Sequence, residues 1–432
     1  MGTYYVRKSG NDGTGDGSTG APWLTINKAL ATVPITGGHT ILVGNGTYAE
    51  DTGPGLNYLM VQRQFVDYVT VQPELGAAGD VTLTNGAVTT YCLRLDASQY
   101  VRFKWLKITS TSHLNDAYCS LIYMTGAVMN HFEFIGCTLT VNSTALGTQW
   151  CWLHQGIVVH VVFDSCTIRQ TGANEVVGIR CNRATAAIDD IQVLNCNIQL
   201  VGTCVYGFDH VTNFVVDGGY YESTGAGIPS ISIGYDGSSA GAVTGFVKNA
   251  VIKSAASHAL LIGSGTSNVE AAYNTICAGD NGIVIKENSG ANVHNNKIIG
   301  CAATQNGIYC KAATNPVIQY NQIIVPAGNC TKVGQNSSTT NKSSGVTFRY
   351  NTCKVICSTG HLIWWGGAAD DSGGGVCDYN KYRSGSAMAA WGAVRADADV
   401  NNLAELRAAW VGYGDGSNDS HSKKTRKPMY LG

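Results

Sequence analysis

Short segments of alternating hydrophobic and polar residues recur along most of the chain with the same shape. Each segment reads as a strand, a turn and a second strand, and none shows the 3.6-residue period of a helix. The last residues of neighbouring segments lie 22 to 31 positions apart. The pattern predicts one β-coil per repeat and excludes helical solenoids and leucine-rich repeats. The segments are FKWLKI (103–108), FIGCTL (134–139), FDSCTI (163–168), VLNCNI (193–198), VDGGYY (216–221), VKNAVI (247–252), AAYNTI (271–276), VHNNKI (293–298), IQYNQI (318–323) and FRYNTC (348–353).

Aligned in this register, the repeats place similar residues in one column, two positions before the end of each segment. Equivalent residues of a parallel β-coil lie about 4.8 Å apart. Asparagines in such a column can therefore bond to one another, while cysteines fill it as small apolar groups. Tyrosines directly before the column are expected to stack. The column holds Leu106, Cys137, Cys166, Cys196, Gly219, Ala250, Asn274, Asn296, Asn321 and Asn351, and the tyrosines are Tyr273, Tyr320 and Tyr350.

With these columns the sequence resembles the right-handed parallel β-helix superfamily, the pectate-lyase-like fold, over nearly its whole length. The resemblance implies an all-β, single-stranded solenoid of about 11–12 coils. We expect a strand and a capping helix in residues 1–40, the parallel β-helix in 41–383, and a cap with a short helix and a final strand in 384–432. All three parts are assigned to one domain.

Both ends of the chain fit a capped solenoid. An amphipathic helix is predicted within 22–33, where it would cover the open edge of the first coil. Its apolar face consists of Ile26, Ala29, Leu30 and Val33. A second helix is expected to start at Asn402-Leu-Ala-Glu405, which has the pattern of a capping box. The stretch YYVRKSGNDGTG…PWLTINKAL…ILVGNGTY resembles the opening of many β-helix repeat proteins from bacteria and bacteriophages.

Composition limits the classes of partner and the cell compartment that we expect for the protein. Charged residues make up 13% of the chain and the formal net charge is −1, which predicts no nucleic-acid partner. No apolar run approaches the roughly 18 residues of a membrane span, and the first residues lack the apolar core of a signal peptide. The 15 cysteines occur singly, without metal-ligand spacing, which favours free thiols in a reducing compartment. We expect synthesis in a cytosol.

The strand that precedes each ladder strand is expected to present its second and fourth residues to solvent. These outward columns combine aromatic rings, acids, an imidazole and two lysines, as a carbohydrate-binding face would. A merely solvated sheet face is the alternative. The two columns are Arg94, Tyr123, Trp152, Arg180, Gly207, Ser232, Leu261, Val284, Tyr309, and Asp96, Thr125, His154, Asn182, Asp209, Gly234, Gly263, Lys286, Lys311. The predicted glycan-binding residues are Trp152, His154, Arg180, Asn182, Asp209, Lys286, Tyr309, Lys311 and Trp365.

Candidate catalytic residues on this face are Lys286, Lys311 and Asp209. A uronate lyase needs a base to remove the proton beside a carboxylate, and Ca²⁺ or a second cation to stabilise the carbanion. The sequence has no cluster of acids for Ca²⁺, so no cofactor is expected unless the protein is a lyase. A glycoside hydrolase needs paired carboxylates. Asp189-Asp190 resembles such a pair, but the companion motifs of polygalacturonases are missing, and we expect a turn there.

Three functional hypotheses remain open. The first is a bacteriophage virion component of tailspike or tail-fibre type, made in the host cytoplasm, that binds and in some cases degrades a host surface polysaccharide. Its partners would be the polysaccharide and other virion proteins, and it could assemble as a homotrimer. The second is a bacterial polysaccharide lyase or glycoside hydrolase, either cytoplasmic or exported without a classical signal. The third is a non-enzymatic structural solenoid.

Overall fold

The computed structural model describes the chain outside 51–57, 75–80, 86–90, 111–119, 143–148, 182–187, 208–210, 235–242, 289, 302–304, 335–342, 357–360, 366–375, 385–391, 395–398, 401–422 and 425–432. The chain forms two compact units, Met1–Tyr221 and Glu222–Gly432. We call them unit 1 and unit 2 and describe each by itself. The predicted helix start at Asn402 lies outside the described residues. The predicted domain boundaries at 40/41 and 383/384 stay predictions.

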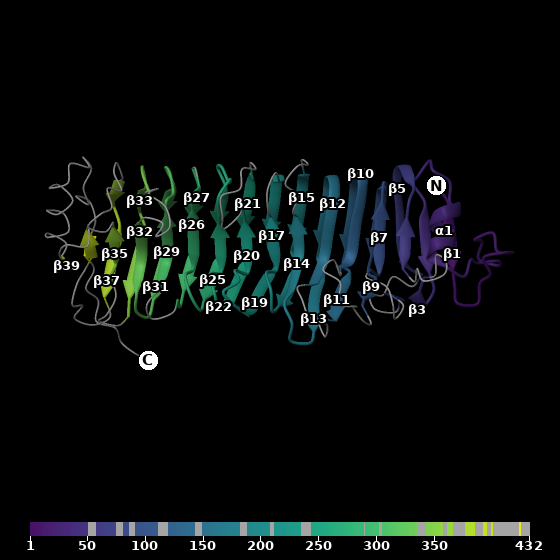
Figure 1. Ribbon diagram of the computed structural model, residues 1–432, viewed down its shortest axis with the longest axis horizontal. Coiled ribbons are helices and arrows are strands. Elements are labelled where there is room, and N and C mark those ends of the chain that lie inside the picture. The colour runs from purple at the N-terminus through teal and green to yellow at the C-terminus, as the bar shows by residue number, and fades with distance from the viewer. Residues whose placement is uncertain are drawn as a thin grey trace. The chain divides into compact units, whose positions relative to one another are not determined.

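Unit 1 is built from coils with three strands each, and every strand pairs in parallel with its counterpart in the next coil (Figure 1). The first strands are β4 (Leu59–Val61), β7 (Leu93–Asp96), β14 (Val176–Cys181) and β17 (Val205–Gly207). The second strands are β1 (Thr3–Val6), β2 (Thr40–Val43), β5 (Gln64–Pro73), β8 (Gln99–Lys104), β15 (Ile188–Leu194) and β18 (Val211–Asp217). The strands β10 (Ser120–Ile135) and β12 (Gln149–Asp164) serve as first and second strand at once. The third strands are β3 (Gly46–Ala49), β6 (Val81–Thr84), β9 (Lys107–Thr109), β11 (Thr138–Asn142), β13 (Thr167–Thr171) and β16 (Asn197–Leu200).

Unit 2 repeats the same plan. Its first strands are β20 (Ile231–Ile233), β23 (Leu260–Ile262), β26 (Ile283–Lys286), β29 (Asn306–Lys311), β32 (Asn329–Gly334), β35 (Ile363–Trp365) and β38 (Gly392–Val394). Its second strands are β21 (Gly245–Lys248), β24 (Glu270–Ala272), β27 (Asn292–His294), β30 (Val317–Gln319), β33 (Thr347–Arg349) and β36 (Val376–Asp378). Its third strands are β22 (Val251–Ala256), β25 (Thr275–Ala278), β28 (Lys297–Ile299), β31 (Gln322–Val325), β34 (Thr352–Val355), β37 (Lys381–Ser384) and β40 (Lys423–Lys424). The short strand β39 (Asp399–Val400) is antiparallel to β38, and β19 (Tyr220–Ala226) runs across the sequence boundary of the units.

This arrangement is the right-handed parallel β-helix that the repeats predict, so the expected fold class is confirmed. In each coil the inward residues are aliphatic or aromatic and close to fully buried. The predicted steps of 22 to 31 residues reflect loops whose lengths differ from coil to coil, such as those between β20 and β21 and between β32 and β33.

The turn between the second and the third strand is the same in coil after coil. A residue with left-handed backbone geometry, such as Ser165 at φ 55° or Asn195 at φ 51°, is followed directly by the ladder residue. In unit 1 the ladder residues are cysteines, and their thiols donate to carbonyl oxygens of the preceding coil. The Sγ of Cys166 lies 3.2 Å from the Phe134 oxygen, and the Sγ of Cys196 lies 3.3 Å from the Phe163 oxygen. The predicted cysteine column is therefore present and buried.

In unit 2 the ladder consists of asparagines. The Nδ2 of Asn274 donates to the Oδ1 of Asn296 over 2.9 Å, and the same bond joins Asn296 to Asn321 and Asn321 to Asn351, each over 3.0 Å. The ladder continues to Asn380, which the repeat alignment did not include. All five side chains are at most 1% exposed, so their amides depend on one another for hydrogen bonds.

A second asparagine ladder precedes the first strands of unit 2, and the sequence analysis missed it. The Nδ2 of Asn306 donates to the Oδ1 of Asn281 over 2.7 Å, and the Nδ2 of Asn329 donates to the Oδ1 of Asn306 over 2.8 Å. Histidines extend both ends: a ring nitrogen of His361 lies 2.9 Å from Asn329, and one of His258 lies 3.2 Å from Asn281. Two amide columns therefore hold the coils of this unit in register.

The tyrosine column is present in part. The rings of Tyr320 and Tyr350 stack with centroids 5.0 Å apart, and Tyr379 continues the stack at 4.9 Å. Tyr273 instead meets His294 edge-on at 5.7 Å. The intervening coil has Asn295 at the equivalent turn position, so no ring connects Tyr273 to the stack.

Helix α1 (Ile26–Thr32) lies at the N-terminal end of unit 1 beside β1, as expected for a cap (Figure 1). Its predicted apolar face is buried, with Ile26, Ala29 and Leu30 at most 1% exposed. The carboxylate of Glu50, itself 1% exposed, accepts from the backbone N–H groups of Ile26 and Asn27 over 2.9 and 2.8 Å. Burial raises the pKa of Glu50 to about 7, although these two bonds act to lower it.

This raised pKa makes the stability of the cap depend on pH. The folded protein holds the Glu50 proton up to about pH 7, whereas the unfolded chain releases it near the ordinary value of 4.5. The stabilisation is therefore complete below the unfolded pKa and is lost as the pH rises through the folded one. We expect the free energy of unfolding to fall by about 3 kcal/mol from pH 5 to pH 8 through this group. In Glu50→Gln, whose side chain stays neutral, the free energy of unfolding should not show this fall between pH 5 and pH 8. The same fall in the variant and in the parent protein would contradict the role of Glu50.

Candidate functional site

The outward residues of the first strands in unit 1 form one continuous surface. Strand pairing sets Met60 of β4 opposite Arg94 of β7, and Arg94 opposite Tyr123 of β10. Farther along, Arg180 of β14 lies opposite Tyr206 of β17. These side chains are half-buried although they lie outside the core. We call the surface of Tyr91, Arg94, Asp96, Tyr123, Trp150, Arg180 and Tyr206 the unit 1 face.

Aromatic rings follow one another along the unit 1 face. Tyr91 and Tyr123 stack nearly parallel, with centroids 4.6 Å apart and planes inclined by 9°. Tyr123 and Tyr206 pack against Trp150, which is 8% exposed. The guanidinium of Arg180 lies 5.3 Å from the centroid of Trp150 and 5.8 Å from that of Tyr206. The planar cation is therefore held among rings, a geometry that leaves its fork of donors in a fixed orientation.

Burial shifts the pKa values of two charged groups in this region, Arg180 and Glu175, in opposite directions. Burial lowers the pKa of the Arg180 guanidinium, and burial raises the pKa of Glu175 while the charge of Arg180 acts against that rise. The Nε of Arg180 is buried and has no hydrogen-bond partner within the described part of the chain. Since Arg180 as a whole is only half-buried, the rest of its guanidinium can still donate to an acceptor supplied from outside, such as a carboxylate or a sugar hydroxyl.

A second polar group lies at the N-terminal end of the same face. The Oδ2 of Asp96 accepts from Arg94 over 3.1 Å and from Gln62 Nε2 over 3.1 Å. Burial acts to lower the pKa of Arg94, but a hydrogen bond with Tyr58 and the charge of Asp96 outweigh it, so the pKa is raised. Arg94 is thus a fixed cation beside the tyrosine stack.

Unit 2 has a cationic surface on its first strands, which we call the unit 2 face and define as Lys286, Tyr309, Lys311, Lys332 and Trp364. Pairing aligns Tyr309 of β29 with Lys332 of β32 and Lys332 with Trp364 of β35. The ammonium of Lys332 lies 5.0 Å from the Tyr309 centroid and 4.5 Å from the Trp364 centroid. In the parallel column Lys286 lies opposite Lys311, as expected from the sequence.

Two predicted members of the outward columns are wrongly placed. Trp152 pairs with Ile122 and Ile179, and His154 pairs with Met124, so both pair with residues that the sequence predicted to face inward. The reason is that Leu121 and Ile122 are both fully buried, which breaks the strict alternation at the start of β10. Aligning Cys151 with Ile122 therefore shifted the next strand by one residue, and Leu153 is the residue that pairs with Arg180.

Other predicted site residues lie at positions that differ from those expected, or lie outside the described residues. Trp365 pairs with the buried Val333, whereas Trp364, which is half-buried, pairs with Lys332 of the unit 2 face. Lys286 is on the predicted column but only 9% exposed, so it is not the open surface charge that the sequence suggested. Asn182 and Asp209 lie outside the described residues. The register also sets Tyr206, not Gly207, beside Arg180.

The sequence analysis missed a column of titratable side chains on the second strands of unit 1. Tyr100 and His131 stack with centroids 4.3 Å apart, His131 and His160 follow at 5.1 Å, and His160 Nδ1 lies 2.5 Å from Asp190 Oδ2. Burial, followed by the charge of His160, lowers the pKa of His131. Asp189 and Asp190 thus lie in β15 and not in the expected turn.

A sequence signal for this column exists. Its members stand six positions before the ladder residue of their coil, and each has positive φ, which marks a recurrent bulge. Extending the alignment backwards from Cys137, Cys166 and Cys196 would have found the column.

Two further observations concern metal binding and membrane-spanning helices. Among the described residues, no three His, Cys, Asp or Glu side chains are grouped closely enough to hold a metal ion. Of the helices in that same part of the chain, none combines the length and the apolar character of a membrane span.

The fold has counterparts among solved structures, but the sequence matches no known protein family and no curated protein. The GH136 lacto-N-biosidase from Eubacterium ramulus superposes with a TM-score of 0.51 at 10% identity, covering 89% of this chain and 68% of the enzyme. The A-module of a mannuronan C-5 epimerase from Azotobacter vinelandii gives a TM-score of 0.47 at 10% identity, with 93% and 94% covered. A mannuronic acid specific family 6 polysaccharide lyase from human gut microbiota gives 0.45 at 11% identity, with 99% and 92% covered. At these identities the likeness concerns the fold.

Proposed function

We propose that the protein binds a polysaccharide along the first strands of its coils. The observation that carries this proposal is the unit 1 face, where rings and a buried guanidinium form one row over adjacent strands. Rings can stack on sugars, and the donors of Arg94 and Arg180 can bind sugar hydroxyls or carboxylates. A screen of capsular and uronic-acid polysaccharides by calorimetry tests binding directly.

The unit 2 face suggests that the polysaccharide is acidic. We expect Lys311→Ala combined with Lys332→Ala to weaken binding of an acidic polysaccharide by about tenfold or more, because two cations are lost from one surface. The melting temperature should change by a few degrees at most, because half-buried charges on the outer side of a strand contribute little to folding. Added salt should also weaken the binding of the acidic polysaccharide by the parent protein.

The matched control for this prediction is Lys297→Ala combined with Lys381→Ala. Both lysines are exposed and lie on third strands of the same unit. Equal affinity losses in the two double variants would show that net charge, and not the unit 2 face, governs binding.

The finer proposal is that the chain belongs to a bacteriophage virion, as a tailspike-type or tail-fibre-type component that binds the host surface. Every cysteine among the described residues is free, and burial raises the pKa of the Cys310 thiol to about 12, so this thiol is poorly reactive. Such a cysteine pattern suits synthesis in a reducing host cytoplasm. Purified protein should then compete with phage particles for adsorption to the host; a lack of competition at saturating concentration would contradict the proposal.

Glu175 favours polysaccharide cleavage as a second candidate function. A carboxyl group whose pKa is raised by burial can stay protonated and act as a general acid on a glycosidic oxygen. If the protein depolymerises its ligand, Glu175→Gln should lower the rate by about a hundredfold or more while binding is retained. The measurement is release of reducing ends, with Glu222→Gln, on the third-strand side, as a control. Full activity in Glu175→Gln would exclude this role.

A further inference from the structure

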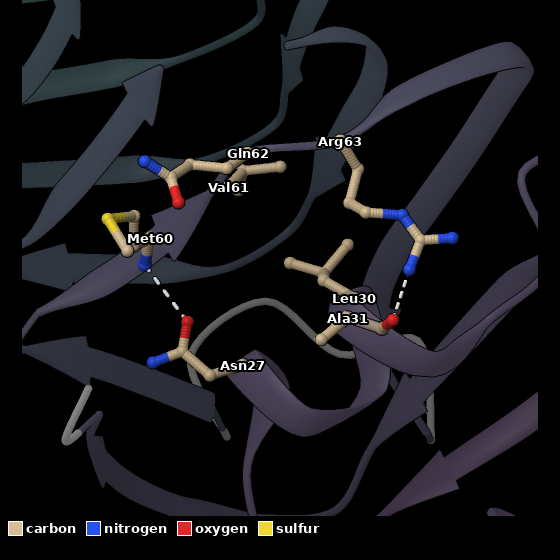
Figure 2. Close-up of a pocket in the computed structure, with 7 residues that line it drawn as sticks. All are labelled: Asn27, Leu30, Ala31, Met60, Val61, Gln62 and Arg63. Atoms are coloured by element: carbon tan, nitrogen blue, oxygen red, sulfur yellow. Dashed lines mark hydrogen bonds between the residues drawn. The ribbon is translucent and has the colours of Figure 1, made fainter. Parts of the chain in front are cut away.

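A pocket lies where the capping helix meets the first coil of unit 1. It has a volume of about 360 Å³ and is lined by residues of α1 and by β4 with the residues that follow it. Figure 2 shows the side chains of Leu30 and Met60 at its wall, with Gln62 and Arg63 beside them. Its volume falls within the range of small-molecule sites.

The pocket lies at the end of the unit 1 face. Met60, which lines it, pairs with Arg94, and Gln62, which also lines it, donates to Asp96. Tyr58, just before β4, meets Tyr91 edge-on with centroids 5.9 Å apart. The row of rings and cations therefore leads to the pocket, and α1 stands beyond it as a wall.

The polar groups of the pocket wall are engaged within the protein. The Oδ1 of Asn27 accepts from the Met60 N–H over 2.9 Å (Figure 2), and its Nδ2 donates to the backbone carbonyl oxygen of Tyr58. Arg63 donates to the carbonyl oxygens of Ala31 and Val33, at the end of α1. The rest of the wall consists of methyl, methylene and thioether groups of Leu30, Ala31, Met60 and Val61.

A wall of this composition selects against a charged or fully hydroxylated group, because burial of such a group would leave its polar atoms without partners. It accepts a methyl-bearing substituent, such as the acetyl group of an acetylated sugar, whose burial is favourable. The sugar ring itself would remain at the mouth, next to Arg94 and Asp96.

We propose that this pocket is a terminal subsite, in which the last sugar of a polysaccharide inserts an acetyl group and beyond which the chain cannot continue. The proposal rests on the function proposed above and adds to it that the protein recognises the end of a glycan chain. Helix α1 serves in this view as the stop at one end of the binding surface as well as a cap of the coil.

The first test counts chain ends. A polysaccharide that binds in the screen is cleaved by mild acid, so that each gram of it has about ten times more chain ends. Calorimetry then measures how much protein binds per gram of polysaccharide before and after cleavage. End recognition predicts about a tenfold rise in binding capacity. A constant capacity per mass would overturn the terminal subsite and leave the proposed binding function intact.

The second test fills the pocket. Ala31 is exposed on α1 and lines the pocket, so Ala31→Phe can occupy it without altering the core, whereas Thr32→Phe places the same ring on the same helix outside the lining. We expect Ala31→Phe to weaken binding of the fragments by about tenfold and Thr32→Phe to change it less than twofold. Melting temperatures establish that both variants fold. Equal affinities of the two variants would overturn the subsite.

A third measurement needs no polysaccharide. Saturation-transfer NMR with N-acetylglucosamine and N-acetylgalactosamine, against glucose and galactose, probes the pocket alone. We expect a methyl signal from the acetylated sugars that is present in Thr32→Phe and absent in Ala31→Phe. No difference between the acetylated and the plain sugars would overturn the subsite, whereas a failed polysaccharide screen with a positive signal here would overturn only the proposed function.

Discussion

Replacement of Asn296 by leucine should lower the free energy of unfolding by about 3 kcal/mol, because the change removes a buried amide on which two neighbouring coils depend. The Oδ1 of Asn296 accepts from the backbone and the side chain of Asn274, over 3.0 and 2.9 Å. Its Nδ2 donates to Asn321 and to the Ala271 oxygen. Leucine satisfies none of these groups, and all of them are shielded from water.

The control for this prediction is Gln322→Leu, which replaces an exposed amide in a neighbouring strand, β31. We expect it to change the free energy of unfolding by less than about 0.5 kcal/mol. Denaturant unfolding monitored by circular dichroism gives both values. Asn292 is unsuited as a control because it is half-buried and lies within β27. Equal destabilisation by the two variants would contradict the role of the amide ladder.

Replacement of Arg180 by methionine should weaken polysaccharide binding by about 10- to 100-fold, since methionine keeps an unbranched stem for packing and loses every donor. The rings of Trp150 and Tyr206 would remain, so the loss reports the guanidinium itself. Folding should be nearly unaffected, because removing a cation whose pKa is already lowered by burial also removes its desolvation cost.

Arg169→Met provides the matched comparison for Arg180→Met. Arg169 belongs to β13, a third strand of the same unit, and its replacement by methionine changes the net charge by the same amount. We expect its affinity to stay within about twofold of the parent protein. If Arg180→Met binds as well as Arg169→Met, the unit 1 face is not the glycan site.

The fold could be predicted from the sequence because the β-coil repeats one turn with strict geometry. Residues such as Cys166 and Asn321 must fill the same space in each coil, so their column survives loops of any length between them. The second ladder was missed because its members stand at the end of those loops, where the spacing in sequence varies. Asn281, Asn306 and Asn329 align only when counted backwards from the first strands.

The site was predictable only in part because outward columns depend on alternation within each strand. One extra buried residue, as at Leu121 and Ile122, moves every later side chain to the opposite face, which is how Trp152 and His154 were misplaced. Bulges have the same effect on the second strands, where His131 and His160 were overlooked. Arg180 and Tyr309 were found because the residues directly before and after each of them are buried, so the alternation holds around that position.

The amide ladder of unit 2 also has a direction, since each Nδ2 donates to the Oδ1 of the asparagine that follows in sequence. Every link has the same donor, the same acceptor and nearly the same length, so any two ladder asparagines are interchangeable partners. Excision of residues 297–321 would therefore bring Asn351 into the place of Asn321 above Asn296, with all bonds restored. The chain can lose or gain whole coils far more easily than single residues, and its length is a property that duplication and deletion can adjust without a new core.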